Sequence, residues 1–303
     1  MADPLLALAG VVKEIRRSHR RVRVVDGVSL DVLPGEIVGL VGPAGAGTTA
    51  LLHLGAGITV PDAGTVRLAG APPDRPRARR LVGFASSHPA FPPTLTVKEV
   101  LDYYARFHAA GINRRALARR ALELGGLGPV ARERVAVLPE NWIARLAFAQ
   151  AALGGRPLLL LDQTLSRLDP LARREVAERL VELAADGTAI LIASHELSVL
   201  ERLAARVVIL RRGAVVHAGP LAALLRQRVL EVVLDRPAER APPGFRATPA
   251  GLETDLGAGT VEAALALCRA HRLAVRASHV RVRSLEDVVV GVCERHDSGY
   301  RSV

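Results

Sequence analysis

The pattern of apolar and polar positions predicts short strands at the start of the chain, followed by an alternation of strands and helices. Residues 5–12 and 22–33 are predicted to be short β segments, separated by a highly charged stretch at 13–21. After a Pro-Gly turn, residues 36–41 form an apolar, β-branched run that is typical of a buried strand. A glycine-rich loop follows this run, and an apolar helix is predicted from about Thr48.

Further along the chain, helical and strand-like patterns alternate. The segment 94–155 has a helical pattern, and its first helix is expected to begin with a capping box formed by Thr96 and Glu99. The Leu-rich run 158–161 is too short for a helix and is predicted to be a buried parallel strand. The remaining predictions are an amphipathic helix at 170–186, a buried strand at 188–193 and a hairpin of 206–211 with 214–218. This alternation predicts an α/β fold on a mainly parallel sheet.

The composition of the chain changes after residue 228. The segments that follow are a predicted strand at 229–234, a Pro- and Gly-rich stretch at 237–259, a helix at about 260–271, a strand at 273–282 and a helix at 284–292. We therefore expect two domains. The first spans residues 1–228 and contains a helical subdomain at about 94–155, and the second is a small α+β accessory domain at 229–303.

Composition excludes several classes of protein. Half of the 303 residues are apolar, which excludes intrinsic disorder, and the two cysteines exclude a disulfide scaffold and suit a reducing compartment. The N-terminus lacks the order of charged and apolar residues that defines a signal peptide. The uncharged run 37–61 is long enough to span a bilayer, but its clustered glycines and His53 argue against a membrane helix. We therefore expect a soluble chain.

The formal net charge of +11 is carried almost entirely by arginine, because only Lys13 and Lys98 among the 41 basic residues are lysine. Positive charge is concentrated at residues 13–23 and 67–80. Nucleic-acid binding is disfavoured, because aromatic residues are not interleaved with these charges. Solvated surfaces, or the proximity of an anionic membrane leaflet, account for the charge better.

One segment carries a pattern for phosphate binding. Residues 42–49, here called the phosphate loop, read Gly-Pro-Ala-Gly-Ala-Gly-Thr-Thr and lie between the apolar run 36–41 and the next helix. This is the setting of a P-loop, in which glycines allow backbone N–H groups to surround phosphate oxygens. Thr49 matches the hydroxyl that binds Mg²⁺, but Thr48 stands where a P-loop has lysine. Taken alone, the segment is also consistent with an ordinary strand–turn–helix.

Further motifs follow the phosphate loop in a fixed order. They are Leu161-Asp162-Gln163, Ser166-Arg167-Leu168-Asp169-Pro170 and Ser194-His195-Glu196, and Asp26-Gly27-Val28-Ser29-Leu30 precedes the loop. Together these motifs resemble the nucleotide-binding domain of ABC transporters over about residues 5–225, and the C-terminal piece resembles the appendage of the drug-exporter branch. The resemblance implies an α/β fold with a P-loop NTPase-type, mainly parallel sheet, an N-terminal antiparallel β subdomain, a helical subdomain and a small C-terminal α+β domain.

The resemblance also implies a role for individual positions. Those that keep the family's residue are Gly42, Gly45, Gly47 and Thr49 of the phosphate loop, the Mg²⁺ ligand Asp162, Ser166 and Asp169 of the D-loop, and His195, a γ-phosphate contact. Four single positions and one loop depart from the pattern. The single positions are Ile15 for the aromatic residue that stacks on adenine, Thr48 for the lysine, Ser87 for a glutamine near Mg²⁺ and Gln163 for the glutamate base. The loop is Leu138-Pro139-Glu140-Asn141-Trp142, which keeps only the leucine of the signature loop Leu-Ser-Gly-Gly-Gln.

Several of these departures weaken nucleotide chemistry. Loss of the lysine's charge-assisted hydrogen bond reduces affinity by about ten- to a hundredfold. Gln163 can orient a water but cannot take its proton, so general-base catalysis worth about 10²–10⁴ in rate is lost. Pro139 has no N–H to offer a phosphate, and the charge of Glu140 is expected to repel one.

We therefore expect an ATP-binding-cassette subunit of an exporter with a degenerate ATPase and a structural or regulatory role. Binding of ATP and Mg²⁺ is expected to be weakened or absent. The implied partners are a separate membrane-spanning transporter subunit and a second nucleotide-binding domain, in a homodimer or a heterodimer, which would hold the chain at the cytoplasmic face of the cell membrane. Two alternatives stay open: an active ATP-hydrolysing subunit that works with substituted residues or in a heterodimer, and a soluble regulatory module without a membrane partner.

Overall fold

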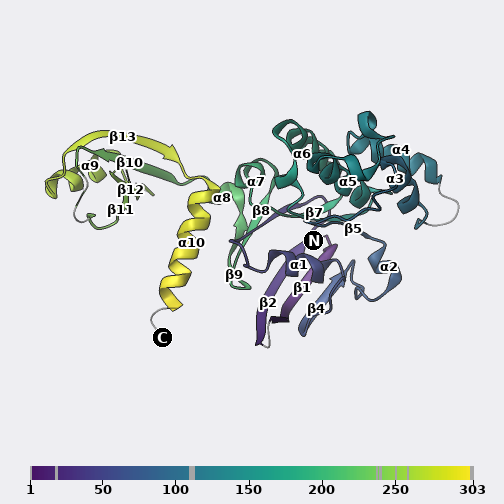
Figure 1. The fold of residues 1–303 in the computed structure, drawn as a ribbon. Coiled ribbons are helices and arrows are strands. Elements are labelled where there is room, and N and C mark those ends of the chain that lie inside the picture. Colours follow the sequence, from purple (N-terminus) through teal and green to yellow (C-terminus); the bar gives the residue numbers. More distant parts are fainter. Residues whose placement is uncertain are drawn as a thin grey trace. The chain divides into compact units, whose positions relative to one another are not determined.

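The computed structural model describes residues 2–17, 20–108, 113–236, 238, 241–249, 251–257 and 259–300. These residues form two compact units (Figure 1). The first unit comprises Met1–Ala218 and Cys293–Val303, and the second comprises Gly219–Val292. The boundary at Gly219 lies before the change of composition at residue 228, and the end of the chain groups with the first unit. That the two predicted domains fold independently of each other stays a prediction.

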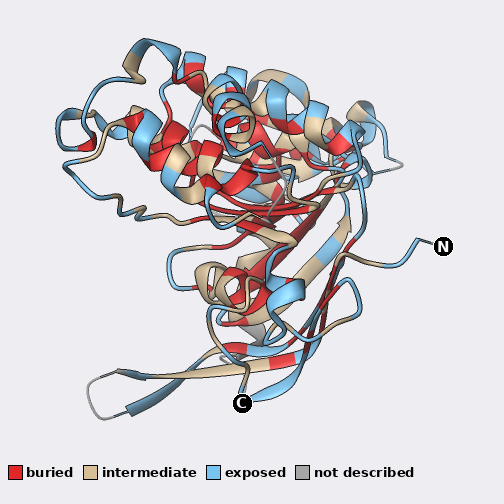
Figure 2. Cartoon of the chain, turned by 90° about the vertical axis from the view of Figure 1, so that its right-hand side faces the viewer, coloured by how far each residue is buried: buried red, intermediate tan, exposed pale blue. Residues whose placement is uncertain are grey.

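A six-stranded sheet forms the centre of the first unit. Its strands are β3 (Ile37–Val41), β5 (Val82–Ala85), β6 (Leu158–Asp162), β7 (Ala189–Ala193), β8 (Arg206–Arg211) and β9 (Ala214–Pro220), in the order β5-β6-β7-β3-β8-β9. The pairs β5–β6, β6–β7, β7–β3 and β3–β8 are parallel. Every residue of β3, β6 and β7 is buried (Figure 2). The mainly parallel sheet predicted from these apolar runs is confirmed.

A separate antiparallel sheet has the strand order β2-β1-β4. Its strands are β1 (Leu6–Arg17), β2 (Arg20–Val32) and β4 (Ala63–Leu68). The prediction that β segments end before the charged stretch is wrong, because Lys13 pairs with Val25 and Arg16 with Arg21 in a long hairpin. Residues 18 and 19 of that stretch lie outside the described residues. Charged side chains are tolerated here because most of them lie on the solvated surface of the hairpin.

Helices cover both faces of the central sheet. The helices of this part of the chain are α1 (Thr48–Gly55), α2 (Pro76–Arg79), α6 (Pro170–Ala185) and α7 (Leu197–Leu203). Leucines of α1 share one hydrophobic core with β1, β2 and the central strands, so α1 lies between the two sheets (Figure 1). The uncharged run 37–61 therefore contains a strand, the phosphate loop and a helix. No described helix is long and apolar enough to span a bilayer.

The segment between β5 and β6 is helical, with a hydrophobic core of its own. It contains α3 (Val97–Ala105), α4 (Arg114–Leu124), α5 (Glu140–Ala152) and short 3₁₀ turns at Gly128–Val130 and Val135–Val137, and a third such turn, Leu165–Arg167, follows β6. The predicted capping box is confirmed, since Thr96 Oγ1 accepts from the N–H of Glu99 and the Glu99 carboxylate accepts from the N–H of Thr96.

The second unit is built on a four-stranded antiparallel sheet in the order β11-β12-β10-β13. Its elements are α8 (Leu221–Leu224), β10 (Arg228–Leu234), β11 (Arg246–Thr248), β12 (Gly251–Asp255), α9 (Val261–Ala270) and β13 (Val275–Val282). The Pro- and Gly-rich stretch therefore contains two strands that the pattern did not predict. The last helix, α10 (Leu285–Tyr300), is longer than the predicted helix, which ended at residue 292.

Candidate functional site

The phosphate loop connects β3 to α1, and it is held in place by the β8–β9 turn and by β2. The N–H of Gly213, in the β8–β9 turn, donates to the carbonyl of Ala46 at 2.9 Å, and the carbonyl of Gly213 accepts from the N–H of Asp26 at 2.8 Å. Gly47 has a φ of +103°, and a Cβ at this position would lie 2.2 Å from the carbonyl oxygen of Val24. Only glycine can therefore keep the loop this close to β2.

The open side of the loop is the N-terminus of α1. Gly47 is the N-cap of this helix and offers no side chain to its first turn. The first N–H groups of a helix have no partner within it, so those of Thr48 and Thr49 are available to a ligand. A Cβ at Gly45 would meet no atom within 4 Å, so the loop faces open space there. The backbone thus fits a phosphate group, but Thr48 brings no positive charge.

Asp162 ends β6 beside the start of α1 and is fully buried. The Thr49 hydroxyl donates to Oδ1 of Asp162 at 3.2 Å. Oδ2 of Asp162 has no hydrogen-bond partner among the described residues, although it is buried. A buried, uncompensated carboxylate next to a hydroxyl is a donor set that suits Mg²⁺, which prefers oxygen ligands. The described residues contain no group of three or more His, Cys, Asp or Glu side chains that could hold a metal ion, so phosphate and water would complete such a site.

Gln163 follows Asp162 with a φ of +53°, which places its side chain between two neighbouring loops. Its carboxamide oxygen accepts from the Ser166 hydroxyl at 3.3 Å and from the N–H of His195 at 3.2 Å. The Ser166 hydroxyl also lies 3.5 Å from that of Ser194. The structure therefore brings the residues after β6 and those after β7 into one hydrogen-bonded group around Gln163. The residue His195 is exposed.

Two further predicted site residues, Ser87 and Ile15, lie outside the phosphate loop and the loops that follow β6 and β7. Ser87 follows β5, and its hydroxyl lies 3.2 Å from Nδ1 of His88. The ends of β3, β5, β6 and β7 lie at one edge of the sheet because these strands are parallel, and ligands of such folds bind at that edge. Ile15 lies on β1, opposite Val22. No described contact joins Ile15 to the phosphate loop.

The signature-loop positions form the start of α5. Leu138 precedes Pro139, the N-cap, which provides no side-chain cap, and Glu140 is the first residue of the helix. Glu140 forms an ion pair with Arg167, and the Asn141 side-chain oxygen accepts from the N–H of Asp169 at 3.4 Å. Arg167 therefore compensates the charge of Glu140 within the same chain. The expected repulsion between Glu140 and a phosphate stays a prediction.

Two arginines near this region were not predicted as site residues. Arg173 donates to the carbonyls of Leu165 and Leu168 and pairs with Glu196 at 3.0 Å, so it joins the loop after β6 to the one after β7. Arg145 is buried, and its guanidinium lies 5.3 Å from the ring centre of Trp142. Neither arginine belongs to a recognisable motif, and no sequence signal identifies them.

Several known proteins are similar to this chain in sequence. The profile of the family described as ABC transporter matches residues 25–166. The Nod factor export ATP-binding protein I of Paraburkholderia xenovorans is 37% identical over 219 residues, which are 71% of this chain and 72% of that protein. The chain belongs to the ABC transporter family. The ABC transporter ATP-binding protein YdbJ of Bacillus subtilis is another relative, 33% identical over 218 residues, or 71% of this chain and 69% of its own.

Solved ABC transporter structures share the fold. An ATP-binding subunit of an ABC transporter superposes with a TM-score of 0.65 at 28% identity, over 73% of this chain and 92% of the other. A dimeric ATP-binding cassette, bound to ADP and Pi in a post-hydrolysis state, has a TM-score of 0.66 at 24% identity, over 71% of this chain and 98% of its own. The predicted family and fold class are confirmed, and the chain is an ATP-binding subunit of an ABC transporter.

Proposed function

We propose that this ABC transporter subunit belongs to an exporter and that it has lost ATP hydrolysis, so that its role is structural or regulatory. The observation that carries the proposal is the state of Gln163. In the family's motif this position holds the carboxylate that takes a proton from the attacking water. Here it holds a carboxamide whose oxygen already accepts two hydrogen bonds, from Ser166 and from His195. An amide does not accept a proton at neutral pH, and the loss of a general base lowers the rate by about 10²–10⁴.

The phosphate loop supports the same proposal. Its backbone keeps the shape of a phosphate cradle, but the side chain that would reach the β- and γ-phosphates is the neutral Thr48. A charge-assisted hydrogen bond contributes about 1.5–3 kcal/mol, so its absence weakens nucleotide binding by about ten- to a hundredfold. The loop is thus suited to weak binding of a nucleotide rather than to tight binding and turnover.

The signature side of the chain is altered as well. The positive N-terminal end of α5 would face a phosphate in a paired cassette, yet Pro139 offers no N–H and Glu140 places a carboxylate there. Arg167 compensates the charge of Glu140, so the change does not destabilise the fold. A carboxylate satisfied in this way is compatible with a stable subunit that no longer binds phosphate at this end.

Retained Mg²⁺ ligands favour a second candidate function, an active subunit that works with substituted residues or in a heterodimer. Thr49 and Asp162 would hold Mg²⁺, with Ser87 as a more distant candidate, and the ion would neutralise phosphate charge. The uncompensated Oδ2 of Asp162 is the specific observation behind this candidate. Both candidate functions require the same fold, so they are separated by how the chain binds nucleotide.

Partners are proposed on two grounds. The relatives named for export support an exporter, and the dimeric cassettes support pairing with a second nucleotide-binding domain. The chain has only five Phe, three Tyr and one Trp, yet four of these side chains form one edge-to-face cluster: Phe91, Tyr103, Tyr104 and Phe107. Tyr103 and Phe107 are 44% and 62% exposed. Such a patch suits contact with the membrane-spanning subunit at the cytoplasmic membrane face.

Equilibrium binding of MgATP tests the proposal. Trp142 is the only tryptophan and lies at the start of α5, so its fluorescence reports changes at the signature positions, and calorimetry gives the affinity independently. We expect weak or undetectable binding, and no phosphate release above that of an Asp162→Ala variant. Micromolar affinity together with turnover that Asp162→Ala abolishes would establish the active candidate instead. If the chain is recovered from native membranes without a membrane-spanning protein, the exporter proposal is overturned in favour of a regulatory module that has no such partner.

A further inference from the structure

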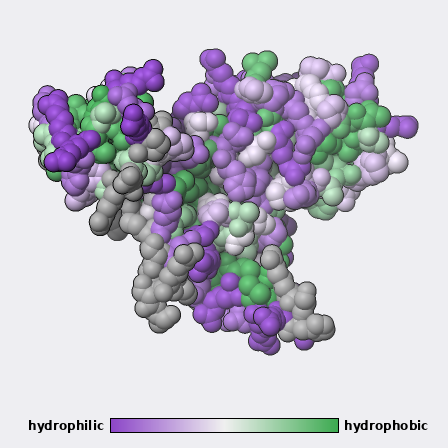
Figure 3. Space-filling model, turned by 60° about the vertical axis from the view of Figure 1, so that its left-hand side comes forward, coloured by the Kyte–Doolittle hydropathy of each residue, from purple (hydrophilic) through white to green (hydrophobic). Residues whose placement is uncertain are grey.

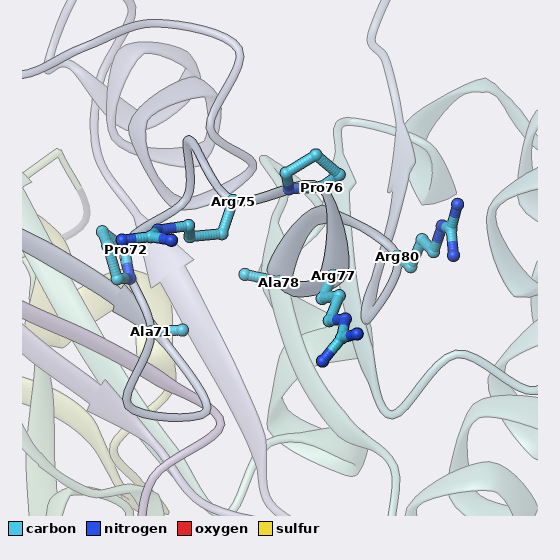
Figure 4. A pocket seen from close by; sticks show the side chains of 7 residues that line it. All are labelled: Ala71, Pro72, Arg75, Pro76, Arg77, Ala78 and Arg80. Atoms are coloured by element: carbon cyan, nitrogen blue, oxygen red, sulfur yellow. The ribbon is translucent and has the colours of Figure 1, made fainter.

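A pocket of about 670 Å³ lies around α2, on the segment that connects β4 to β5 (Figure 4). Its apolar lining, here called the floor, consists of Ala71, Pro72, Pro76 and Ala78, of which only Ala78 is buried. Its rim carries three arginines: Arg75, Arg77 and Arg80. None of these residues takes part in the nucleotide site described above. The pocket is therefore a separate feature of the first unit.

The backbone that carries the rim is fixed by the core. Ala78 packs into the hydrophobic cluster shared by β1, α1 and the central strands. The Arg79 side chain donates to the carbonyl of Pro73 at 2.7 Å, and Arg156 donates to the carbonyl of Arg80. The positions from which the three rim arginines project are thus held in place, although their side chains are exposed.

The rim arginines have no acidic partner within 4 Å in the described part of the chain. Elsewhere arginines pair with carboxylates, as Arg173 does with Glu196 and Arg206 with Glu36. Burial lowers the pKa of Arg156, and the charge of Arg80 lowers it further. The arginines of this segment outnumber its single carboxylate, Asp74, and this excess of positive charge favours an anionic partner.

The shape of the pocket restricts the kind of anion. Figure 4 shows that the arginines point apart, with Arg75 directed toward Pro72 and the side chains of Arg77 and Arg80 directed elsewhere. One small anion such as phosphate cannot contact all three at once. A flat membrane surface would meet the exposed arginines and prolines but not the buried Ala78. The face of the molecule in Figure 3 shows hydrophilic and hydrophobic side chains side by side, so apolar surface next to charge is not confined to one place. The α2 pocket is set apart by its three arginines.

We propose that this pocket is the docking site of an acidic peptide segment of another protein, which places an apolar side chain on the floor and carboxylates on the three arginines. Arginine suits this role because its planar guanidinium binds carboxylates through paired hydrogen bonds. The proposal concerns a surface apart from the nucleotide site, and it stands whether or not the chain binds ATP.

Peptide binding to the full chain tests the proposal. The probe is a short, dye-labelled peptide with Glu residues around a central Leu, followed by fluorescence anisotropy at about 0.15 M salt, where distant charges are screened. The variant R75Q/R77Q/R80Q removes the rim charges. Exposed ion pairs contribute about 0.2–1 kcal/mol each, so we expect affinity about tenfold weaker. The control variant R114Q/R115Q/R120Q changes the same charge on exposed residues of α4 and is expected to bind like the original chain.

Further probes separate the peptide from other anions. A peptide with Gln in place of Glu is expected to bind about tenfold more weakly than the Glu peptide, and thermal melting is expected to show the same stability for all variants. Equal binding of the peptide by both triple variants would overturn the proposal. It would also be overturned if inorganic phosphate, or vesicles of phosphatidylglycerol, bound the rim arginines while the peptide did not, or if no probe bound at all.

Discussion

Neutralising Asp162 should stabilise the ligand-free chain, even though this residue belongs to the site. Its side chain is fully buried, one oxygen accepts from Thr49 at 3.2 Å, and the other has no partner in the described chain. Asp162→Asn keeps the acceptor for Thr49 and removes the buried charge. A buried neutral polar group without a partner destabilises a fold by about 1–3 kcal/mol, and a charged one by more. We expect a net stabilisation of about 1–2 kcal/mol.

The assay is thermal or urea unfolding in the presence of EDTA. For a unit of this size, each kcal/mol raises the melting temperature by about 2–4 °C. Asp186→Asn, at the exposed end of α6, is the matched control and is expected to change stability by less than about 0.5 kcal/mol. Added Mg²⁺ should stabilise the original chain and not the Asp162→Asn variant. A variant that melts below the original chain in EDTA would refute the reasoning, because the carboxylate would then be compensated by contacts within the fold.

Three further predictions concern other parts of the structure. Burial by itself raises the pKa of Asp287, but hydrogen bonds, chiefly from Arg281, lower it to about 2. The stability that this group contributes is therefore complete above its usual pKa of 3.8 and is lost as the pH falls toward 2. Asp287→Asn should remove that pH dependence in acid unfolding followed by circular dichroism. Gly47→Ala should lower stability by more than the roughly 1–3 kcal/mol of backbone strain, whereas Gly45→Ala, which meets no neighbour, should show strain alone in the same melts. Asp297→Asn should speed hydrogen exchange in the last turns of α10 while changing overall stability by less than about 1 kcal/mol, since its ion pairs are partly exposed.

Sequence patterns predicted those parts of the structure that depend on local chemistry. The central strands are continuous apolar runs, and only a strand buried on both faces needs such a run. The capping box joins two residues three positions apart, Thr96 and Glu99, so its sequence signature is sufficient. The neighbourhood of Thr49 and Asp162 follows from parallel strands that end at one edge of the sheet.

Other features depend on contacts between distant segments. Glu140 and Arg167 are 27 residues apart, and their pairing depends on how α5 packs beside the turn after β6. The long hairpin of β1 and β2 continues through charged residues because cross-strand pairing, rather than apolar content, extends it. Strands β11 and β12 form within a Pro- and Gly-rich stretch because β10 provides a partner for β12. Periodicity within one segment contains no information on any of these contacts.

The most direct test of lost catalysis is phosphate release from MgATP by the original chain and by a chain with both Thr48→Lys and Gln163→Glu. We expect the original chain to release phosphate no faster than its Asp162→Ala variant. We also expect the double substitution to bind MgATP at least about tenfold more tightly, because a charge-assisted hydrogen bond returns to the phosphate loop. Turnover by the original chain that Asp162→Ala abolishes would contradict the loss of ATP hydrolysis.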